Sequence, residues 1–84
     1  MTTYVERIVR TQRITLKKAH NVRFRLGDME YRIVYEGGIG EYFGIYGRRG
    51  AERFRFICGF NAYKMHTVEE VVDNAKRKVQ NLKK

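Results

Sequence analysis

Apolar and charged residues alternate along the segment from Val22 to Tyr35, with one interruption at Gly27-Asp28. An apolar residue at every second position is typical of half-buried β-strands, so the segment predicts two strands joined by a turn. A two-residue turn that begins with glycine favours type II′ and would pair Leu26 with Met29. The register then pairs Phe24 with Tyr31 and Val22 with Ile33 on an apolar face, and Arg25 with Glu30 and Arg23 with Arg32 on a basic face.

A second hairpin is predicted after the glycine-rich turn at residues 37–40. Its tip is Gly47-Arg48-Arg49-Gly50, which exposes two arginines. The predicted partners are Phe43 with Phe56 and Ile45 with Phe54 on the apolar face, and Tyr46 with Arg53, Gly44 with Arg55 and Tyr42 with Ile57 on the other.

A helix is predicted from Val68 to about Leu82. Thr67-Val68-Glu69-Glu70 fits a capping box, in which the threonine and the second glutamate satisfy amides at a helix start. Apolar residues recur at helical spacing and form one stripe, at Val68, Val71, Val72, Ala75, Val79 and Leu82. Acidic residues near the start and basic residues near the end, including Lys76, Lys83 and Lys84, suit the helix dipole.

The first twenty residues carry a weaker pattern. β-Branched and aromatic residues are frequent from Thr3 to Leu16 and favour a strand, although Thr3-Tyr4-Val5-Glu6 also fits the start of a helix. Basic residues in this part form either an arm along a phosphate backbone or a charged edge strand; they are Arg7, Arg10, Arg13, Lys17, Lys18 and His20. The fold class is therefore α+β: one domain over residues 1–84, with an antiparallel sheet of four or five strands and a C-terminal helix packed on its apolar face.

Charge narrows the choice of partner. The 84 residues include 18 lysines and arginines against 9 aspartates and glutamates, a formal net charge of +9, which favours a polyanionic partner. The predicted sheet concentrates arginine and tyrosine on one face, and we expect Arg23, Arg25, Arg53 and Arg55 to share it. The candidate nucleic-acid-binding residues are Arg23, Arg25, Arg32, Tyr42, Tyr46, Arg48, Arg49, Arg53 and Arg55. Guanidinium groups bind phosphates and guanine edges in a forked geometry, and tyrosine rings stack on bases. Alternating arginines also suit an ordinary solvated face, but that explanation leaves the tyrosines and Gly44 unaccounted for.

Few residues suggest catalysis or metal binding. The single cysteine, Cys58, lacks a histidine partner at zinc-site spacing and is expected to be a small buried residue. The carboxylates have turn, cross-strand or surface roles, so no acid/base pair stands out. The sequence therefore predicts no enzyme, metal or cofactor. No apolar stretch has the length of a signal peptide or a membrane span, which predicts a cytoplasmic protein without membrane contact.

Gly44-Ile45-Tyr46 and, ten residues later, Phe56-Ile57-Cys58-Gly59 resemble the paired signature of the GIY-YIG nucleases. The resemblance covers about sixteen residues, of which Tyr46 and Gly59 match well. Phe56 and Cys58 depart from the second motif, and no glutamate follows Asp73 where that family carries its metal-binding glutamate. These departures argue against cleavage.

The segment from Tyr42 to about Lys78 resembles the DNA-binding domains of the AP2 and integrase-arm type. It has the order of a strand, an arginine-rich tip, a strand ending in Cys58-Gly59-Phe60 and a capped helix. In those domains the sheet lies in the major groove, and the helix supports it from behind. The resemblance implies that Tyr46, Arg53 and Arg55 face DNA and that Val68, Val71, Val72 and Ala75 face the sheet. The connection from Asn61 to His66 and the absence of tryptophan depart from the family pattern.

Two functions remain open from the sequence. The first is a nucleic-acid-binding module, with DNA slightly preferred over RNA. The second is a small regulator or inhibitor that docks on an acidic protein through the same arginines and tyrosines, which are also common interface anchors. A homodimer through the segment from Tyr4 to Leu16 is a further possibility.

Overall fold

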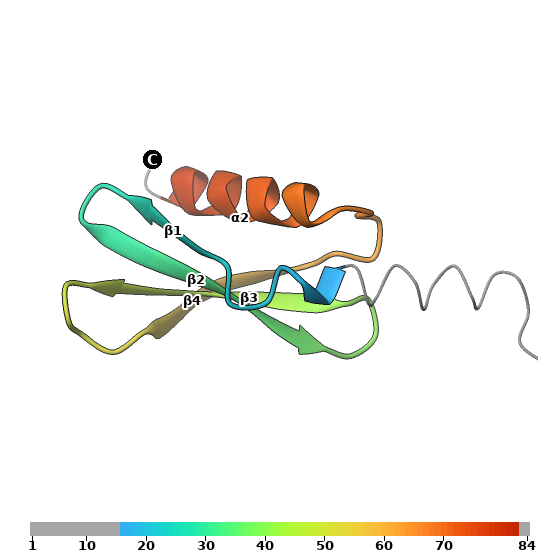
Figure 1. Cartoon of the computed structure of the whole chain (residues 1–84), viewed down its shortest axis with the longest axis horizontal. Coiled ribbons are helices and arrows are strands. Elements are labelled where there is room, and N and C mark those ends of the chain that lie inside the picture. The colour runs from blue at the N-terminus through green and yellow to red at the C-terminus, as the bar shows by residue number, and fades with distance from the viewer. Residues whose placement is uncertain (1–15, 83–84) are drawn as a thin grey trace, which may run out of the picture.

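A computed structural model describes residues 16–82, which contain four strands followed by one helix (Figure 1). The elements are β1 (Arg23–Leu26), β2 (Met29–Gly37), β3 (Tyr42–Arg49), β4 (Arg55–Asn61) and α2 (Val68–Leu82). The strands form one antiparallel sheet in the order β1-β2-β3-β4. The fold is therefore α+β, with four of the predicted four or five strands present in the described residues.

The β1–β2 hairpin has the predicted register throughout. Leu26 pairs with Met29 and Arg23 with Arg32, and the hydrogen bond from the Ile33 amide to the Val22 carbonyl extends the alignment beyond β1. Gly27 has a φ of +63°, a conformation that glycine adopts at little cost and that a type II′ turn requires at its first central position. A two-residue turn leaves no slack between the strands, which is why this register follows from the sequence.

The predicted register of the β3–β4 hairpin is wrong. Phe43 pairs with Phe60 rather than Phe56, and Ile45 pairs with Cys58 rather than Phe54. Two features of the chain cause the difference. Residues 50–54 form a longer connection than the predicted tip, and Ile57 is an extra residue in β4 at an irregularity opposite the step from Ile45 to Tyr46. A β-bulge of this kind reverses the facing of the residues beyond it, so the predicted pairs of Tyr46 with Arg53, Gly44 with Arg55 and Tyr42 with Ile57 do not form.

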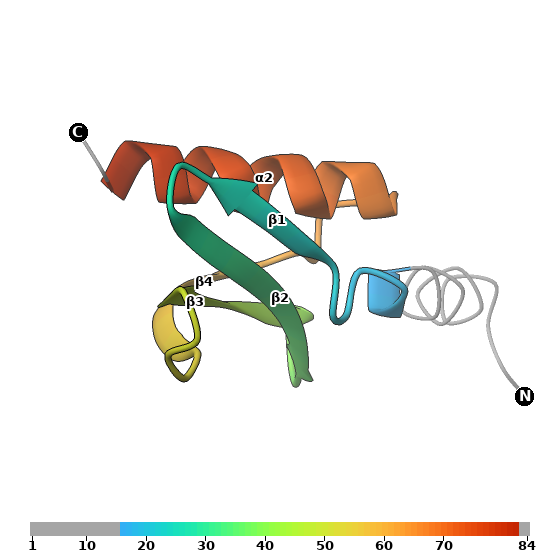
Figure 2. The ribbon, with the colours of Figure 1, turned by 60° about the vertical axis from the view of Figure 1, so that its left-hand side comes forward.

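Buried apolar residues form one cluster to which both the sheet and the helix contribute. Ile33 and Ile45 are fully buried at the centre of the sheet, and Val71, Ala75 and Val79 of α2 belong to the same cluster. Figure 2 shows α2 running along one side of the sheet. We call the sheet face that carries Ile33 and Ile45 the core face.

The start of α2 has the threonine half of the predicted capping box, whereas the Glu70 carboxylate bonds the Thr67 hydroxyl rather than an amide. The Glu70 amide donates to the Thr67 hydroxyl oxygen at 3.1 Å, and the Glu70 carboxylate accepts from the same hydroxyl at 3.3 Å. The charge pattern fits the helix dipole at this end only: the first turn carries Glu69 and Glu70, whereas the last turn before Leu82 has no basic residue.

The strand predicted over residues 3–16 lies outside the described residues except for Leu16, which is helical and fully buried. The arginines of the predicted basic arm are also outside them. His20, the last member of that group, accepts a hydrogen bond at Nδ1 from the Tyr35 amide at 2.9 Å and so joins residues 16–21 to β2.

The strand β4 forms one edge of the sheet. The Lys78 ammonium of α2 donates to the Gly59 carbonyl oxygen of β4 at 2.9 Å. A backbone acceptor of the edge strand is therefore satisfied by a helix side chain.

Candidate nucleic-acid interface

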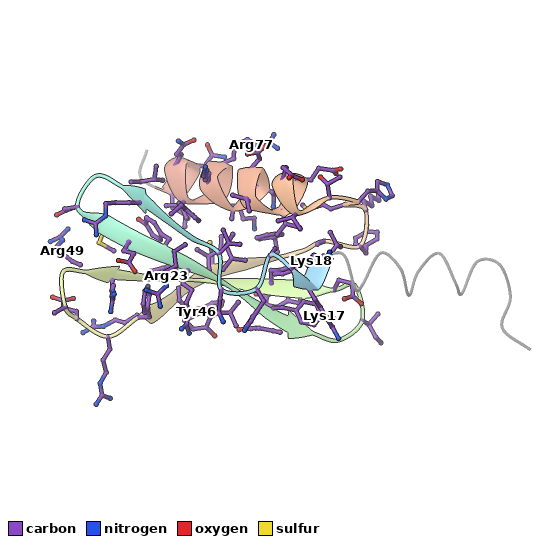
Figure 3. All side chains as sticks on the ribbon, in the orientation of Figure 1. Lys17, Lys18, Arg23, Tyr46, Arg49 and Arg77 are labelled. Carbon is purple, nitrogen blue, oxygen red and sulfur yellow. The ribbon has the colours of Figure 1, made fainter. Side chains whose placement is uncertain are left out.

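The sheet face opposite the core face gathers arginine, tyrosine and glutamate. Successive residues of a strand point to opposite faces, and directly paired residues share one face, so the neighbours of Ile33 and Ile45 define this surface. We call it the outer face. Its members in the described residues are Arg23, Arg25, Glu30, Arg32, Val34, Gly37, Tyr42, Gly44, Tyr46, Arg48, Phe56, Gly59 and Asn61. Glu36, which is unpaired at an irregularity of β2, joins them through its hydrogen bond from the Tyr46 hydroxyl. Figure 3 shows Tyr46 on the side of the sheet away from α2.

Three guanidinium groups surround one aromatic ring on the outer face. Phe54, in the connection before β4, has its ring centroid 4.4 Å from Cζ of Arg48, 5.2 Å from that of Arg32 and 5.7 Å from that of Arg23. These distances are within the range of cation–π attraction. The three arginines come from β1, β2 and β3, so Phe54 holds cations of three strands at one place.

Two of these arginines carry a buried N–H donor that has no acceptor in the described residues. The Nε atoms of Arg32 and Arg48 are buried and have no hydrogen-bond acceptor within residues 16–82. Buried donors normally find an acceptor, and leaving one without an acceptor costs free energy. The Phe54 ring packs against both guanidiniums and supplies a partial compensation through its π-face.

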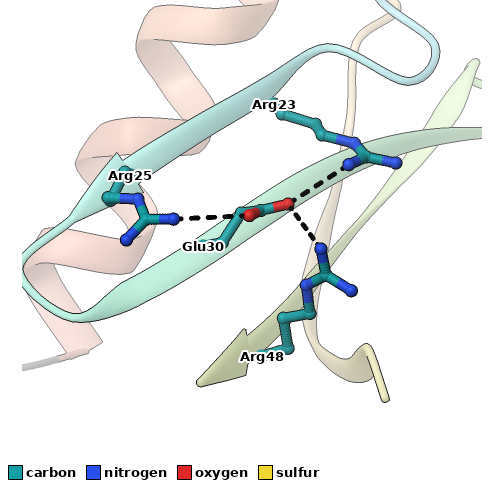
Figure 4. A network of polar contacts seen from close by, with 4 residues as sticks. All are labelled: Arg23, Arg25, Glu30 and Arg48. Atoms are coloured by element: carbon teal, nitrogen blue, oxygen red, sulfur yellow. Dashed lines mark hydrogen bonds and ion pairs between the residues drawn. The ribbon is translucent and has the colours of Figure 1, made fainter. Parts of the chain in front are cut away.

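Glu30 is the carboxylate at the centre of this basic group (Figure 4). Its Oε1 lies 3.3 Å from Nη1 of Arg23 and 3.3 Å from Nη2 of Arg48, and its Oε2 lies 3.6 Å from Nη2 of Arg25. The Glu30 side chain is only 19% exposed, whereas those of Arg23 and Arg25 are 55% and 68% exposed. One carboxylate therefore orients three arginines whose cationic ends reach solvent to different extents.

An aromatic stripe runs beside the arginines along β3 and β4. Gly44 and Gly59 face each other across the two strands, and a Cβ at Gly59 would lie 2.0 Å from the Tyr42 hydroxyl oxygen. A Cβ at Gly44 would lie 3.0 Å from a ring carbon of Tyr46. The two tyrosine rings thus lie across the glycines and close to the backbone. Tyr46 also contacts Phe56 edge to face, with centroids 5.5 Å apart and an interplanar angle of 75°.

The Tyr46 hydroxyl donates to the Glu36 carboxylate at 2.6 Å. This hydrogen bond, followed by partial desolvation and the negative charge of Glu36, raises the pKa of the Tyr46 phenol above its ordinary value near 10. Arg32 acts in the opposite direction but has the smaller influence. Tyr46 therefore remains a neutral hydrogen-bond donor at physiological pH.

The structure brings six of the nine predicted site residues together on the outer face: Arg23, Arg25, Arg32, Tyr42, Tyr46 and Arg48. The expectation that Arg53 and Arg55 share this face is wrong. Arg55 pairs with Gly47, whose absent Cβ would meet the Tyr31 ring of the core face, and Arg53 lies in the connection before β4. The cause is the altered register of the second hairpin.

The other three predicted site residues, Arg49, Arg53 and Arg55, lie at the end of the sheet. Arg49 forms an ion pair with Asp28 at 3.0 Å, which joins the tips of the two hairpins. Arg48, Arg49, Arg53 and Arg55 line one hollow of about 260 Å³ together with Glu52. Arg48 therefore belongs both to this hollow and to the outer face.

Sequence reasoning missed two aromatic residues of the surface. Phe54 and Phe56 were both expected on the apolar face, whereas Phe54 lies among the outer-face arginines and Phe56 is 53% exposed. The run Arg53-Phe54-Arg55-Phe56 fits two registers equally well by alternation alone. The available signal was the run Phe56-Ile57-Cys58, because consecutive apolar residues interrupt the alternation that a single unbroken register requires.

The single thiol lies apart from the outer face. Burial raises the pKa of the Cys58 thiol, and the nearby Lys78 charge lowers it to a smaller degree. Across residues 16–82, no three histidine, cysteine, aspartate or glutamate side chains come together as a metal site would require. In the same residues, no helix is long and apolar enough to cross a bilayer.

No family model, curated protein or solved structure matches this chain.

Proposed function

We propose that this protein is a small non-enzymatic module that binds nucleic acid through the outer face. The observation that carries the proposal is the gathering of Arg23, Arg32 and Arg48 around Phe54, beside the tyrosines of β3. Arginines from three strands at one place give a surface that matches closely spaced phosphates. Such a surface is the electrostatic footprint of a nucleic-acid-binding protein.

The charge balance of the outer face supports a polyanionic partner. Within residues 16–82 it carries the arginines Arg23, Arg25, Arg32 and Arg48 against the glutamates Glu30 and Glu36. Both glutamates are already engaged, Glu30 by arginines and Glu36 by the Tyr46 hydroxyl. Arginine binds phosphate through two parallel N–H donors, so it suits this role better than a lysine would.

We infer a slight preference for DNA over RNA, but not the major-groove contact with a duplex that the resemblance to the AP2 and integrase-arm domains implies. Tyr46 lies on the outer face as that resemblance implies, but Arg53 and Arg55 do not. The contacts of the proposed surface therefore come from β1, β2 and β3 rather than from the second hairpin alone. Parallel measurements with deoxyribose and ribose strands of one sequence test the choice.

The proposal is tested by fluorescence anisotropy of labelled oligonucleotides over a series of salt concentrations. If the four outer-face arginines each neutralise one phosphate, log affinity falls against log salt with a slope of about −3. The double variant Arg23→Gln/Arg25→Gln should bind more weakly and have a slope shallower by about 1.5, because two phosphate contacts are lost.

The matched control is Lys76→Gln/Arg77→Gln, which removes the same charge from α2. Figure 3 shows Arg77 pointing away from the sheet. We expect this control to keep most of the salt dependence. Equal losses in the two double variants would show that net charge, rather than the outer face, determines binding.

Absence of binding to every oligonucleotide at low salt would reject the proposal. In that case a pull-down after nuclease digestion would reveal an acidic protein partner, which the same arginines also suit.

A further inference from the structure

We propose that the outer face binds single-stranded nucleic acid in preference to a duplex, with Phe56 as a stacking surface for a base. The inference rests on the proposed function and names the substrate class of the same surface. Three observations carry it: the exposure of Phe56, the low position of the tyrosine rings, and the order of charges and rings across the strands.

Phe56 is a large apolar side chain with 53% of its surface exposed, and it lies on the outer face rather than the core face. The edge-to-face contact with Tyr46 holds the ring from one side without covering it. An exposed, supported aromatic ring beside guanidinium groups is the arrangement on which proteins stack unpaired bases. Burial of this ring against a base also removes apolar surface from water.

The tyrosine rings lie too close to the sheet to enter a groove. Tyr42 lies across Gly59, where a Cβ would meet its hydroxyl oxygen at 2.0 Å, and Tyr46 is held down by its bond to Glu36. Reading a duplex requires side chains that project to the base edges, because the faces of paired bases are stacked on one another. Unpaired bases expose their faces, and aromatic rings that lie close to the sheet can contact those faces.

The order of residues across the strands matches the polarity of one nucleotide. Arg32 pairs with Tyr46, and Tyr46 pairs with Phe56, so a cation, a phenol and an exposed ring form one row across β2, β3 and β4. With neighbouring strands about 5 Å apart, the row extends about 10 Å. A nucleotide with its phosphate at the Arg32 end and its base at the Phe56 end would have the phosphate near a cation and the base near an aromatic ring.

The experiment compares one labelled oligonucleotide as a single strand and as its duplex, at equal salt, by fluorescence anisotropy. We expect the single strand to bind at least about 5-fold more tightly, the gain from stacking one base. Phe56→Ala should weaken single-strand binding by about 5-fold or more and change duplex binding less than 2-fold. Phe56→Leu should behave as Phe56→Ala does, because it keeps an apolar side chain but removes the π-face.

Tyr63→Ala is the control for loss of an exposed ring. Tyr63 is 59% exposed and lies after the opposite end of β4, so this variant should keep the wild-type affinity for both forms. Thermal unfolding of each variant verifies that the fold is retained. Duplex binding equal to or tighter than single-strand binding overturns the inference, as does wild-type affinity in Phe56→Leu. Both outcomes leave the proposed function standing, whereas absence of any nucleic-acid binding removes the proposed function itself.

Discussion

The Glu30 carboxylate lies among Arg23, Arg25 and Arg48, where the phosphate of a bound nucleic acid would also lie. A phosphate that approaches these arginines competes with the carboxylate for the same N–H donors. Glu30→Gln removes the negative charge with little change in shape. We therefore expect Glu30→Gln to bind oligonucleotides more tightly than the wild type, as measured by anisotropy at fixed salt.

Asp28→Asn is the matched control for Glu30→Gln. Asp28 also pairs with an arginine, but it lies at the turn, is 69% exposed, and its partner Arg49 lies off the outer face. The two variants have the same net charge. A gain in affinity as large in Asp28→Asn as in Glu30→Gln would contradict a specific role for the carboxylate among the three arginines.

The Tyr46 phenol should show its hydrogen bond in a pH titration. Since the bond to Glu36 raises its pKa, the folded state holds the proton more tightly than the unfolded state. The resulting stabilisation is present below about pH 10, the pKa of an unfolded tyrosine, and is lost as pH rises through the higher folded pKa. In a spectrophotometric titration, Glu36→Gln should move the Tyr46 transition toward its ordinary pKa, with Tyr46→Phe identifying that transition. An unchanged transition in Glu36→Gln would contradict the assignment of the cause.

At the scale of elements, the two hairpins show when the alternation of apolar and polar residues is sufficient to predict the strand register. The turn at Gly27-Asp28 has two residues, so the pairing of β1 with β2 follows once the turn is recognised. The β3–β4 connection spans residues 50–54, and a longer loop permits several registers. Ile57 then adds an unpaired residue to β4. A prediction from alternation assumes that every second residue shares a face, so it cannot include such an extra residue. The helix was predictable from Val68 to Leu82 because the threonine cap and the apolar spacing agree.

The Tyr42 side chain packs over Gly59 of β4, in the space that a side chain at this position would fill. Its added Cβ would meet the Tyr42 hydroxyl oxygen at 2.0 Å and the Phe43 carbonyl oxygen at 2.8 Å. The ring can move, but the backbone of β3 cannot move without disturbing the sheet. Gly59→Ala should therefore lower the free energy of unfolding by about 1 to 3 kcal/mol in chemical denaturation.

A double-mutant cycle with Tyr42→Ala separates the two contacts of Gly59. If the ring causes part of the loss, the double variant loses less than the sum of the single variants. Additive losses would assign the whole effect to the Phe43 carbonyl. Stability of Gly59→Ala equal to that of the wild type would contradict the close approach of Tyr42.

At the scale of the whole molecule, the positive charge of the described residues is distributed unevenly over their surface. Arg23, Arg25, Arg32 and Arg48 occupy the outer face, while Arg49, Arg53 and Arg55 lie at the end of the sheet. The facing of Arg23, Arg25 and Arg32 was predictable because the two-residue turn at Gly27-Asp28 determines the pairing of β1 with β2. The second group was not, since its position depends on a bulge and on the path of a five-residue connection. The cation–π group around Phe54 depends on that path too, so only the tertiary structure reveals it.

The bond from Lys78 to the Gly59 carbonyl joins α2 to the edge of the sheet. An edge strand with open backbone groups is a template for other chains. As the chain leaves the ribosome, β4 is synthesised before Lys78, so the Gly59 carbonyl stays open until α2 is in place. The time between these two events is the period in which nascent copies can pair through β4. Aggregation during synthesis should therefore depend on how quickly this helix forms, even though the folded protein protects the Gly59 carbonyl.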